Sequence, residues 1–347
     1  MNPILLTMKA LLKYKNGGIS LIFLALVACQ EQKDLVFNSY AGGALGTNYS
    51  ILFFADEKLN LEQEIDSVFQ DINFSMSTYI PESDISRINS GDHSIIVDAM
   101  FREVLELSKR IHAETGGYFD PTVGILVNAW GFGPGEMQEL DSTKVDSLLR
   151  YVGLEKVVLK ADRTIKMESE GMQLDFNAIA KGYAIDRLGV FLEELGIEDF
   201  LVEVGGEVIT LGINQDKQKE WTVGIDDPQV EFGRRLKLAI RLKDRAMASS
   251  GNYRKFRIDS VTGMKYVHTI DPKTGFTINS NTLGATVLAA SCAEADAYAT
   301  AFMAMPLEEA ISFLSAHQEL DGYLIYVDDE GVLQEFRTSG FQELVLY

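Results

Sequence analysis

The segment SCAEADAYATAF, residues 291–302, sets polar side chains into a run of alanines. Asp296 and Thr300 stand four residues apart, and in a helix this spacing places both on one face. Their oxygens could then meet at one point, an arrangement that suits a hard divalent cation such as Mg²⁺. The alternative is structural, with Asp296 capping a loop and Thr300 bonding back to its own helix. The residues alone favour the structural alternative, because such pairs are common in helices.

Seven further segments interrupt apolar runs with polar residues or glycine. Each alone is weak evidence, since glycine usually marks a turn. Lys181 falls in the first turn of a predicted helix, where its charge opposes the helix dipole and so favours a ligand role over a surface role. His268 is the one histidine with other suggestive groups beside it. The segments are ALGTNY (44–49), FSMSTY (74–79), YFDPTVG (118–124), DFNAIAKG (175–182), VEVGGE (202–207), ASSGNYRKF (248–256) and HTIDPKTG (268–275).

Several common sites are absent from the sequence. No G-x-x-x-x-G-K-[ST] phosphate-binding loop occurs, and neither H-E-x-x-H nor a Cys/His cluster suggests zinc. The run GFGPGE does not fit a dinucleotide-binding turn, because Pro134 interrupts it and no suitable strand precedes it. The formal net charge of -20 would repel the phosphates of nucleic acid.

The elements that must position these segments follow from hydrophobic periodicity. Strands are predicted at 48–55 and 235–242, and hairpins at 157–167, 200–213, 256–270 and 322–336. Helices are predicted at 61–72, from an N-cap at Asp98 to Gly116, at 178–196, at 291–302 and at 307–317, whereas 77–91 and 116–136 are predicted to be loops. Strands outnumber helices and mostly form hairpins. We therefore expect one α+β domain with a largely antiparallel or mixed sheet flanked by helices.

The N-terminus has the pattern of an export signal. Three lysines precede the apolar run ISLIFLALVAC, which is too short to span a bilayer comfortably. The run ends in LVAC, small residues before a cysteine, as in a bacterial lipoprotein cleavage box. The alternative is an ordinary signal peptide or anchor that happens to contain a cysteine. We predict a lipoprotein signal peptide at 1–28, lipidation of Cys29, a tether at 29–34 and a single domain at 35–347.

Together, and in this order, the segments resemble the ApbE family of flavin transferases. The resemblance covers essentially the whole mature chain. Its most specific pieces are D-x-x-x-I-A-K-G, V-E-x-G-G-E, S-G-x-Y, H-x-I-D-P-x-T-G and A-D-A-x-A-T. It implies an enzyme that binds FAD and Mg²⁺, transfers the FMN half of FAD to a Thr or Ser hydroxyl of an acceptor protein, and releases AMP. Such a reaction is a phosphoryl transfer.

The resemblance also implies roles for particular residues. The metal ligands would be the side chains of Asp296 and Thr300 with the backbone carbonyls of Ala178 and Ala299. Lys181 would offset phosphate charge and His268 would contact FAD or assist proton transfer, which makes Asp296, Lys181 and His268 the catalytic set. The residues that contact FAD would be Leu45 (where the family usually has Met), Tyr79, Phe119, Asp120, Asp175, Lys181 and His268.

The expected partner is an acceptor flavoprotein, either a subunit of a membrane redox complex or an exported flavoprotein. The expected location is the bacterial cell membrane, with the domain lipid-anchored and facing outside the cytoplasm. Two alternatives stay open at this point. The same site could act as an FAD pyrophosphatase with water as nucleophile, or the protein could be a lipoprotein that binds flavin without reacting.

Overall fold

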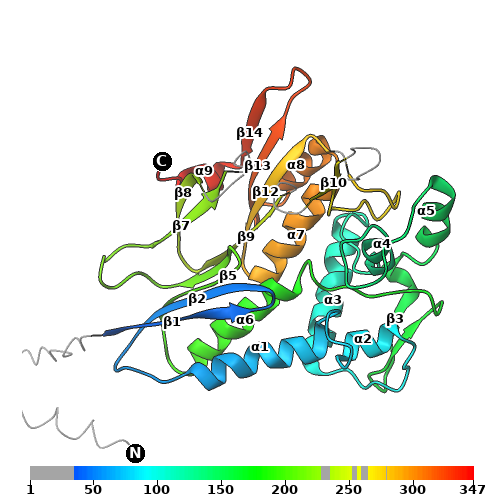
Figure 1. The fold of residues 1–347 in the computed structure, drawn as a ribbon. Helices are drawn as coiled ribbons and strands as arrows, with labels where there is room; N and C mark the ends of the chain where they lie inside the picture. Colours follow the sequence, from blue (N-terminus) through cyan, green and yellow to red (C-terminus); the bar gives the residue numbers. More distant parts are fainter. Residues whose placement is uncertain (1–34, 228–234, 252–255, 259–264, 279) are drawn as a thin grey trace, which may run out of the picture. The chain divides into compact units, whose positions relative to one another are not determined.

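The structure is a computed structural model that describes residues 35–227, 235–251, 256–258, 265–278 and 280–347. Its main element is an eight-stranded sheet with the strand order β1-β2-β5-β6-β9-β12-β13-β14 (Figure 1). Every neighbouring pair is antiparallel, which confirms the predicted α+β class. The strands are β1 Val36–Ala44, β2 Thr47–Ala55, β5 Asp199–Val204, β6 Glu207–Leu211, β9 Arg245–Gly251, β12 Thr282–Ala289, β13 Asp321–Val327 and β14 Leu333–Arg337.

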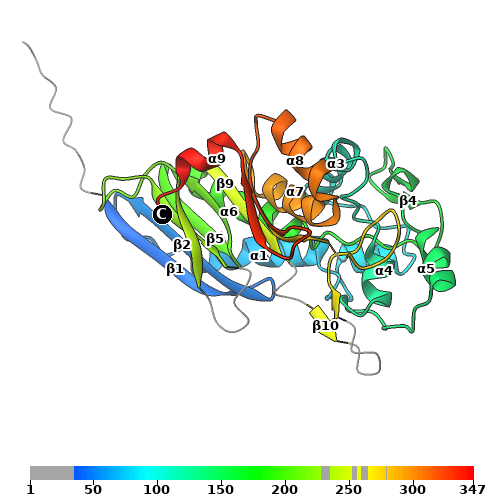
Figure 2. The ribbon, with the colours of Figure 1, turned by 90° about the horizontal axis from the view of Figure 1, so that it is seen from above.

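The remaining elements of the described ranges are helices and three short strand pairs. Helices α2 to α5 lie together on one side of the domain, away from β7 and β8 (Figures 1 and 2). The helices are α1 Glu62–Met76, α2 Asp84–Asn89, α3 Ala99–Glu114, α4 Gly124–Ala129, α5 Ser142–Leu149, α6 Ala180–Glu194, α7 Cys292–Ala304, α8 Leu307–Ala316 and α9 Ser339–Leu344. The strand pairs are β3 Val157–Leu159 with β4 Ile165–Met167, β7 Trp221–Asp226 with β8 Leu236–Leu242, and β10 Phe256–Ile258 with β11 Lys265–Val267.

The two faces of the sheet bury different partners, because side chains alternate along a strand. On β9, Ala246 and Ala248 join the main core, which also contains α6 and α7. Met247, between them, belongs to a second core with residues of β7, β8 and α9. The small alanines on the first face allow α7 to pack closely against β9 and β12. Within α7 only Glu294 and Thr300 are not buried, so the alanine-rich sequence belongs to a helix that is enclosed on almost every side.

Most of the predicted elements are confirmed. The four predicted hairpins correspond to β3-β4, β5-β6, β10-β11 and β13-β14, although the VTG turn of the third lies outside the described residues. The predicted N-cap of α3 is also present, since the Asp98 carboxylate accepts a hydrogen bond from the Phe101 N–H at 2.7 Å.

Several parts of the chain differ from the prediction, and the elements α5, α9, β7, β9 and β12 were not predicted at all. The predicted loop at 77–91 contains α2, which is capped by Ser83 and buries Ile85 and Ile88, and the loop at 116–136 contains α4. Strand β1 was not predicted, because most of its residues are exposed and it lacks an alternating pattern. It forms through pairing with β2 along its whole length. Helices α2 and α4 are only six residues long, too short for a helical period to show in the sequence.

Leu35–Tyr347 form one compact unit. Within the described ranges, no helix combines the length and the apolar character needed to cross a membrane. Cys29 and the apolar run before it lie outside the described residues, so the signal peptide and the lipidation remain predictions.

Candidate active site

Helices α6 and α7 cap one another where they cross. Asp296 of α7 accepts a hydrogen bond from the Gly182 N–H in the first turn of α6, at 3.2 Å. Asp186 of α6 in turn accepts hydrogen bonds from the N–H groups of Cys292 and Ala293 in the first turn of α7, at 2.6 and 2.9 Å. Carboxylates at helix N-termini satisfy free N–H groups and interact favourably with the positive end of the helix dipole. The predicted metal ligand Asp296 is therefore also a structural residue.

The close crossing explains the glycine of the A-K-G motif. A Cβ atom on Gly182 would overlap the backbone of Cys292 and Ala293. Because backbones approach this closely only without a side chain between them, any larger residue would push the two helices apart. Gly182 thus brings its neighbour Lys181 to the same place as Asp296.

A buried charge cluster lies at this crossing. The Lys181 Nζ is 2.5 Å from the Glu207 carboxylate and 3.9 Å from the Asp296 carboxylate. The side chains of Glu207 and Asp296 are only 6% and 5% exposed. Burial would lower the pKa of Lys181, but the two carboxylates raise it above its ordinary value, so the ammonium stays charged. Burial raises the pKa of Glu207, and the charge of Lys181 opposes that rise.

Glu207 is the residue that the sequence analysis missed. It closes the V-E-V-G-G-E motif, which was noted without a role for its second acid. Gly205 and Gly206 both have positive φ angles, 67° and 107°, so the tight β5-β6 turn requires glycine. The Gly205 N–H donates to the Asn48 carbonyl oxygen at 3.0 Å, and a Cβ on Gly205 would lie 2.9 Å from the Thr47 methyl carbon. The turn between β1 and β2 therefore lies beside Glu207.

The turn between β1 and β2 also carries Leu45. This residue is half-buried, and its φ of 49° is unusual for a residue with a side chain. The structure places it two residues from Thr47, near the charge cluster. Its predicted contact with FAD stays a prediction.

Thr300 lies one turn further along α7 than Asp296. Its hydroxyl is half-buried and lies 3.4 Å from the Ser250 hydroxyl at the end of β9. The S-G-x-Y and A-D-A-x-A-T motifs thus meet, although Tyr253 lies outside the described residues. Ala299 is fully buried and Ala178 is half-buried just before α6. The structure therefore brings all four predicted metal ligands onto α6 and α7 or next to them.

Asp175 lies shortly before α6 in the chain, and Tyr79 lies near Asp175. The Asp175 carboxylate accepts a hydrogen bond from the Asn177 N–H at 2.8 Å, and the Asn177 side chain donates to the Thr78 hydroxyl at 3.2 Å. Burial and then the nearby charge of Asp175 raise the pKa of Tyr79. The Tyr79 side chain is nevertheless 58% exposed, so its ring can still contact a ligand.

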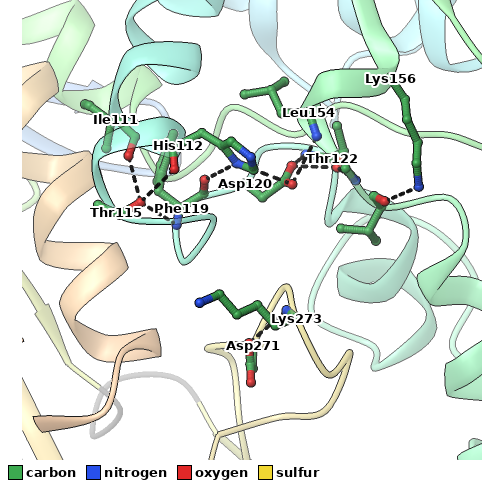
Figure 3. A network of polar contacts seen from close by, with 12 residues as sticks. Ile111, His112, Thr115, Phe119, Asp120, Thr122, Leu154, Lys156, Asp271 and Lys273 are labelled. Atoms are coloured by element: carbon green, nitrogen blue, oxygen red, sulfur yellow. Dashed lines mark hydrogen bonds and ion pairs between the residues drawn. The ribbon is translucent and has the colours of Figure 1, made fainter. Parts of the chain in front are cut away.

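Phe119 and Asp120 have different surroundings (Figure 3). The Asp120 carboxylate accepts hydrogen bonds from the Thr122 N–H and hydroxyl, at 2.8 and 2.5 Å, and from the Leu154 N–H at 3.2 Å. Burial raises its pKa, against these hydrogen bonds and the nearby His112 ring. Phe119 is 3% exposed and packs in the main core. Both side chains are buried and stabilise the loop, and their contacts with FAD stay a prediction.

His268 is half-buried at the start of the HTIDPKTG loop. Further along this loop, the Lys273 ammonium lies 3.5 Å from the centre of the Tyr118 ring, which ties the loop to the YFDPTVG segment. Tyr118 and Met305 line two neighbouring cavities of about 520 and 320 Å³ at the C-terminal end of α7. These cavities leave room for a ligand beside the loop that carries His268.

Comparison with known proteins identifies the family. The ApbE family model matches residues 45–324. An FAD:protein FMN transferase from Vibrio cholerae is 33% identical over 338 residues, covering 94% of this chain and 98% of the relative. A protein of the same name from Haemophilus influenzae is 32% identical over 334 residues, or 92% and 94% of the two chains. The solved structure of the flavin transferase ApbE from Vibrio cholerae matches with a TM-score of 0.78 at 31% identity, over 90% of this chain and 100% of that chain. This chain belongs to the ApbE family.

Proposed function

We propose that this protein is an FAD:protein FMN transferase, which attaches the FMN half of FAD to a Thr or Ser hydroxyl of an acceptor flavoprotein and releases AMP. The observation that carries the proposal is the match to curated transferases of that name over nearly their whole length. The crossing of α6 and α7 is consistent with this function, because it gathers a half-buried lysine and two buried carboxylates near a threonine hydroxyl.

Mg²⁺ is part of the same proposal. The Asp296 carboxylate, the Thr300 hydroxyl and the carbonyl oxygens of Ala178 and Ala299 would hold it, and all four are the oxygen donors that Mg²⁺ prefers. The charge of the cluster fits a cation, since Lys181 offsets only one of the two buried carboxylates. In the described part of the chain no three His, Cys, Asp or Glu side chains form a metal cluster, and the proposed ligand set contains a single carboxylate. When bound, the ion would neutralise pyrophosphate charge.

The reaction balances without an additional reactant. The hydroxyl oxygen of the acceptor bonds to the phosphorus of the FMN half, the bond from that phosphorus to the bridging oxygen breaks, and AMP leaves with that oxygen. The hydroxyl proton passes to a base or to water. Lys181 offsets phosphate charge, Asp175 accepts hydrogen bonds from the flavin or ribityl part, and His268 contacts FAD or takes the proton.

The test is to incubate the protein with FAD, Mg²⁺ and a candidate flavoprotein domain, and to measure the intact mass of that domain together with free AMP. A mass increase equal to FMN, with AMP released in equal amount, supports the proposal. An acceptor with its Thr or Ser replaced by Ala serves as the control. Free FMN and AMP with an unmodified acceptor would instead indicate a pyrophosphatase, and FAD that is bound but intact would indicate a carrier.

We also propose that the protein is lipid-anchored through Cys29 on the outer side of the bacterial cell membrane, close to exported or membrane-bound acceptors. The support is the sequence pattern of lysines, short apolar run and LVAC box. Cys29→Ala should abolish acyl labelling and release the protein from the membrane fraction. A variant that stays in the membrane with an uncleaved N-terminus would show that residues 19–28 are an anchor instead.

A further inference from the structure

We propose that Glu207 is a positioning residue, whose carboxylate holds the Lys181 ammonium beside Asp296 and keeps it from pairing with Asp296 directly. This inference rests on the proposed function, because it assumes that Asp296 serves a metal ion and Lys181 a phosphate. It adds a residue that has no role in the resemblance described above.

The Lys181 Nζ lies much closer to the Glu207 carboxylate than to the Asp296 carboxylate. A charged N–H···O hydrogen bond normally measures about 2.7–2.9 Å between its heavy atoms. The Lys181 Nζ lies within hydrogen-bond distance of the Glu207 carboxylate, at 2.5 Å, and too far from the Asp296 carboxylate for a hydrogen bond, at 3.9 Å. Lys181 is thus bonded to Glu207 and only near Asp296. The Asp296 oxygen that faces Lys181 accepts its hydrogen bond from the Gly182 N–H instead.

The β5-β6 hairpin places Glu207 on the face of the sheet that carries the helices. Glu207 pairs with Val204, which is part of the main core, so both side chains point toward α6. Glu203, the other acid of the V-E-V-G-G-E motif, pairs with Val208 of the second core and points the opposite way. The motif therefore supplies one acid to Lys181 and one acid that cannot reach it.

Stability alone gives a poor account of Glu207. Its second carboxylate oxygen, Oε2, is buried and has no hydrogen-bond partner among the described residues. A largely buried ion pair with such an unpaired oxygen adds little to stability, and apolar side chains of similar size often serve as well. A carboxylate at this position does make sense if its task is to hold a lysine.

Loss of the Glu207 charge has a defined consequence. The Lys181 side chain is long and flexible, and Asp296 is the other carboxylate in its salt-bridge range among the described residues. Lys181 would then move onto Asp296 and compete with a cation for its oxygens. The effect of Glu207 on metal binding therefore passes through Lys181.

A double-mutant experiment tests whether Glu207 acts on metal binding through Lys181. Mg²⁺ is titrated into full-length wild-type protein, Glu207→Gln, Lys181→Met and the double variant, and binding is followed by calorimetry. We expect Glu207→Gln to weaken Mg²⁺ binding about tenfold, as expected for loss of one charged ligand to a competing ion pair. Adding Lys181→Met should restore the affinity to that of Lys181→Met alone. Glu203→Gln is the matched control and should leave the affinity unchanged.

The outcomes separate this inference from the proposed function. An unchanged affinity in Glu207→Gln, or a double variant as weak as Glu207→Gln, would overturn the positioning role while leaving the transferase proposal intact. The second of these results would show that Glu207 acts on the ion directly. A wild-type protein that binds no Mg²⁺ would overturn the proposed metal site itself. Melting curves identify any variant that does not fold, and for such a variant Glu207→Asp, which keeps the charge, replaces Glu207→Gln and should weaken binding less.

Discussion

Asp120 and Asp296 are both buried carboxylates in motifs of the same family pattern, but their surroundings differ. Asp120 accepts three hydrogen bonds, from both polar groups of Thr122 and from the Leu154 N–H, and lies near the His112 ring. Among the described residues, Asp296 accepts one hydrogen bond, from the Gly182 N–H, and it shares its surroundings with a lysine and a second buried acid. The first carboxylate is fully used by the fold, whereas the second retains capacity for a ligand.

The same contrast exists within one pair of helices. Asp186 and Asp296 each cap the other's helix, but both oxygens of Asp186 accept hydrogen bonds from backbone N–H groups of α7. Buried acids therefore differ in what they contribute to a fold and to a site, and the number of hydrogen bonds that each already accepts separates the two uses. The predictions below test that separation.

The largest effect concerns Asp186 and pH. Burial raises the pKa of Asp186 from 3.8 to about 7, so the folded protein retains a proton there that the unfolded chain releases near pH 4. Its contribution to stability is present below pH 4 and is lost as the pH rises to about 7. This loss amounts to about 4 kcal/mol, at about 1.4 kcal/mol for each pKa unit. Urea unfolding at several pH values should show the loss in the wild type and not in Asp186→Asn, and parallel curves would contradict the prediction.

The next effect concerns Asp120 as a residue of the fold. Asp120→Ala leaves the buried N–H groups of Thr122 and Leu154 without their acceptor, and should lower the free energy of unfolding by about 2 kcal/mol. Asp120→Asn keeps one acceptor and should cost less. Chemical denaturation measures both variants. A stable Asp120→Ala protein with weakened FAD binding would show that Asp120 serves FAD binding and not stability. The contrast with Asp296 would then be wrong.

Asp296→Asn should do the opposite of Asp120→Ala. Asn retains an oxygen for the Gly182 N–H but removes the charge that a metal ion requires, so turnover should need about tenfold more Mg²⁺ or stop. The melting temperature should change little. FMN transfer measured against Mg²⁺ concentration, with melting curves alongside, decides the matter. A wild-type metal curve for this variant would leave Asp296 with only its capping role.

The smallest effect is expected for Thr300→Val. This nearly isosteric change removes one neutral oxygen, so the Mg²⁺ requirement should rise by only about threefold, in the same direction as for Asp296→Asn. The Ser250 hydroxyl, 3.4 Å away, loses one neighbour, and the fold should be unaffected. The same transfer assay measures the effect. A larger effect than that of Asp296→Asn would assign the charged interaction to another residue.

The sequence by itself determined the α+β class, the four hairpins and the long helices, because periodicity of side chains and turn residues are local properties. It also pointed to α7, since a carboxylate among alanines is visible in a single segment. It missed α2 and α4, which are too short for a period, and β1, which depends on pairing with β2. It also missed α5, α9 and the strands β7, β9 and β12.

The tertiary structure alone decided which polar residues meet. Lys181, Glu207 and Asp296 come from three elements that are distant in the sequence, and no local pattern shows that they share one cluster. It also decided that Asp120 and Asp186 accept hydrogen bonds from groups on other segments. Hydrogen bonding between distant segments depends on packing, and packing is what brings Gly182 against Cys292 and sets Lys181 between its two acids.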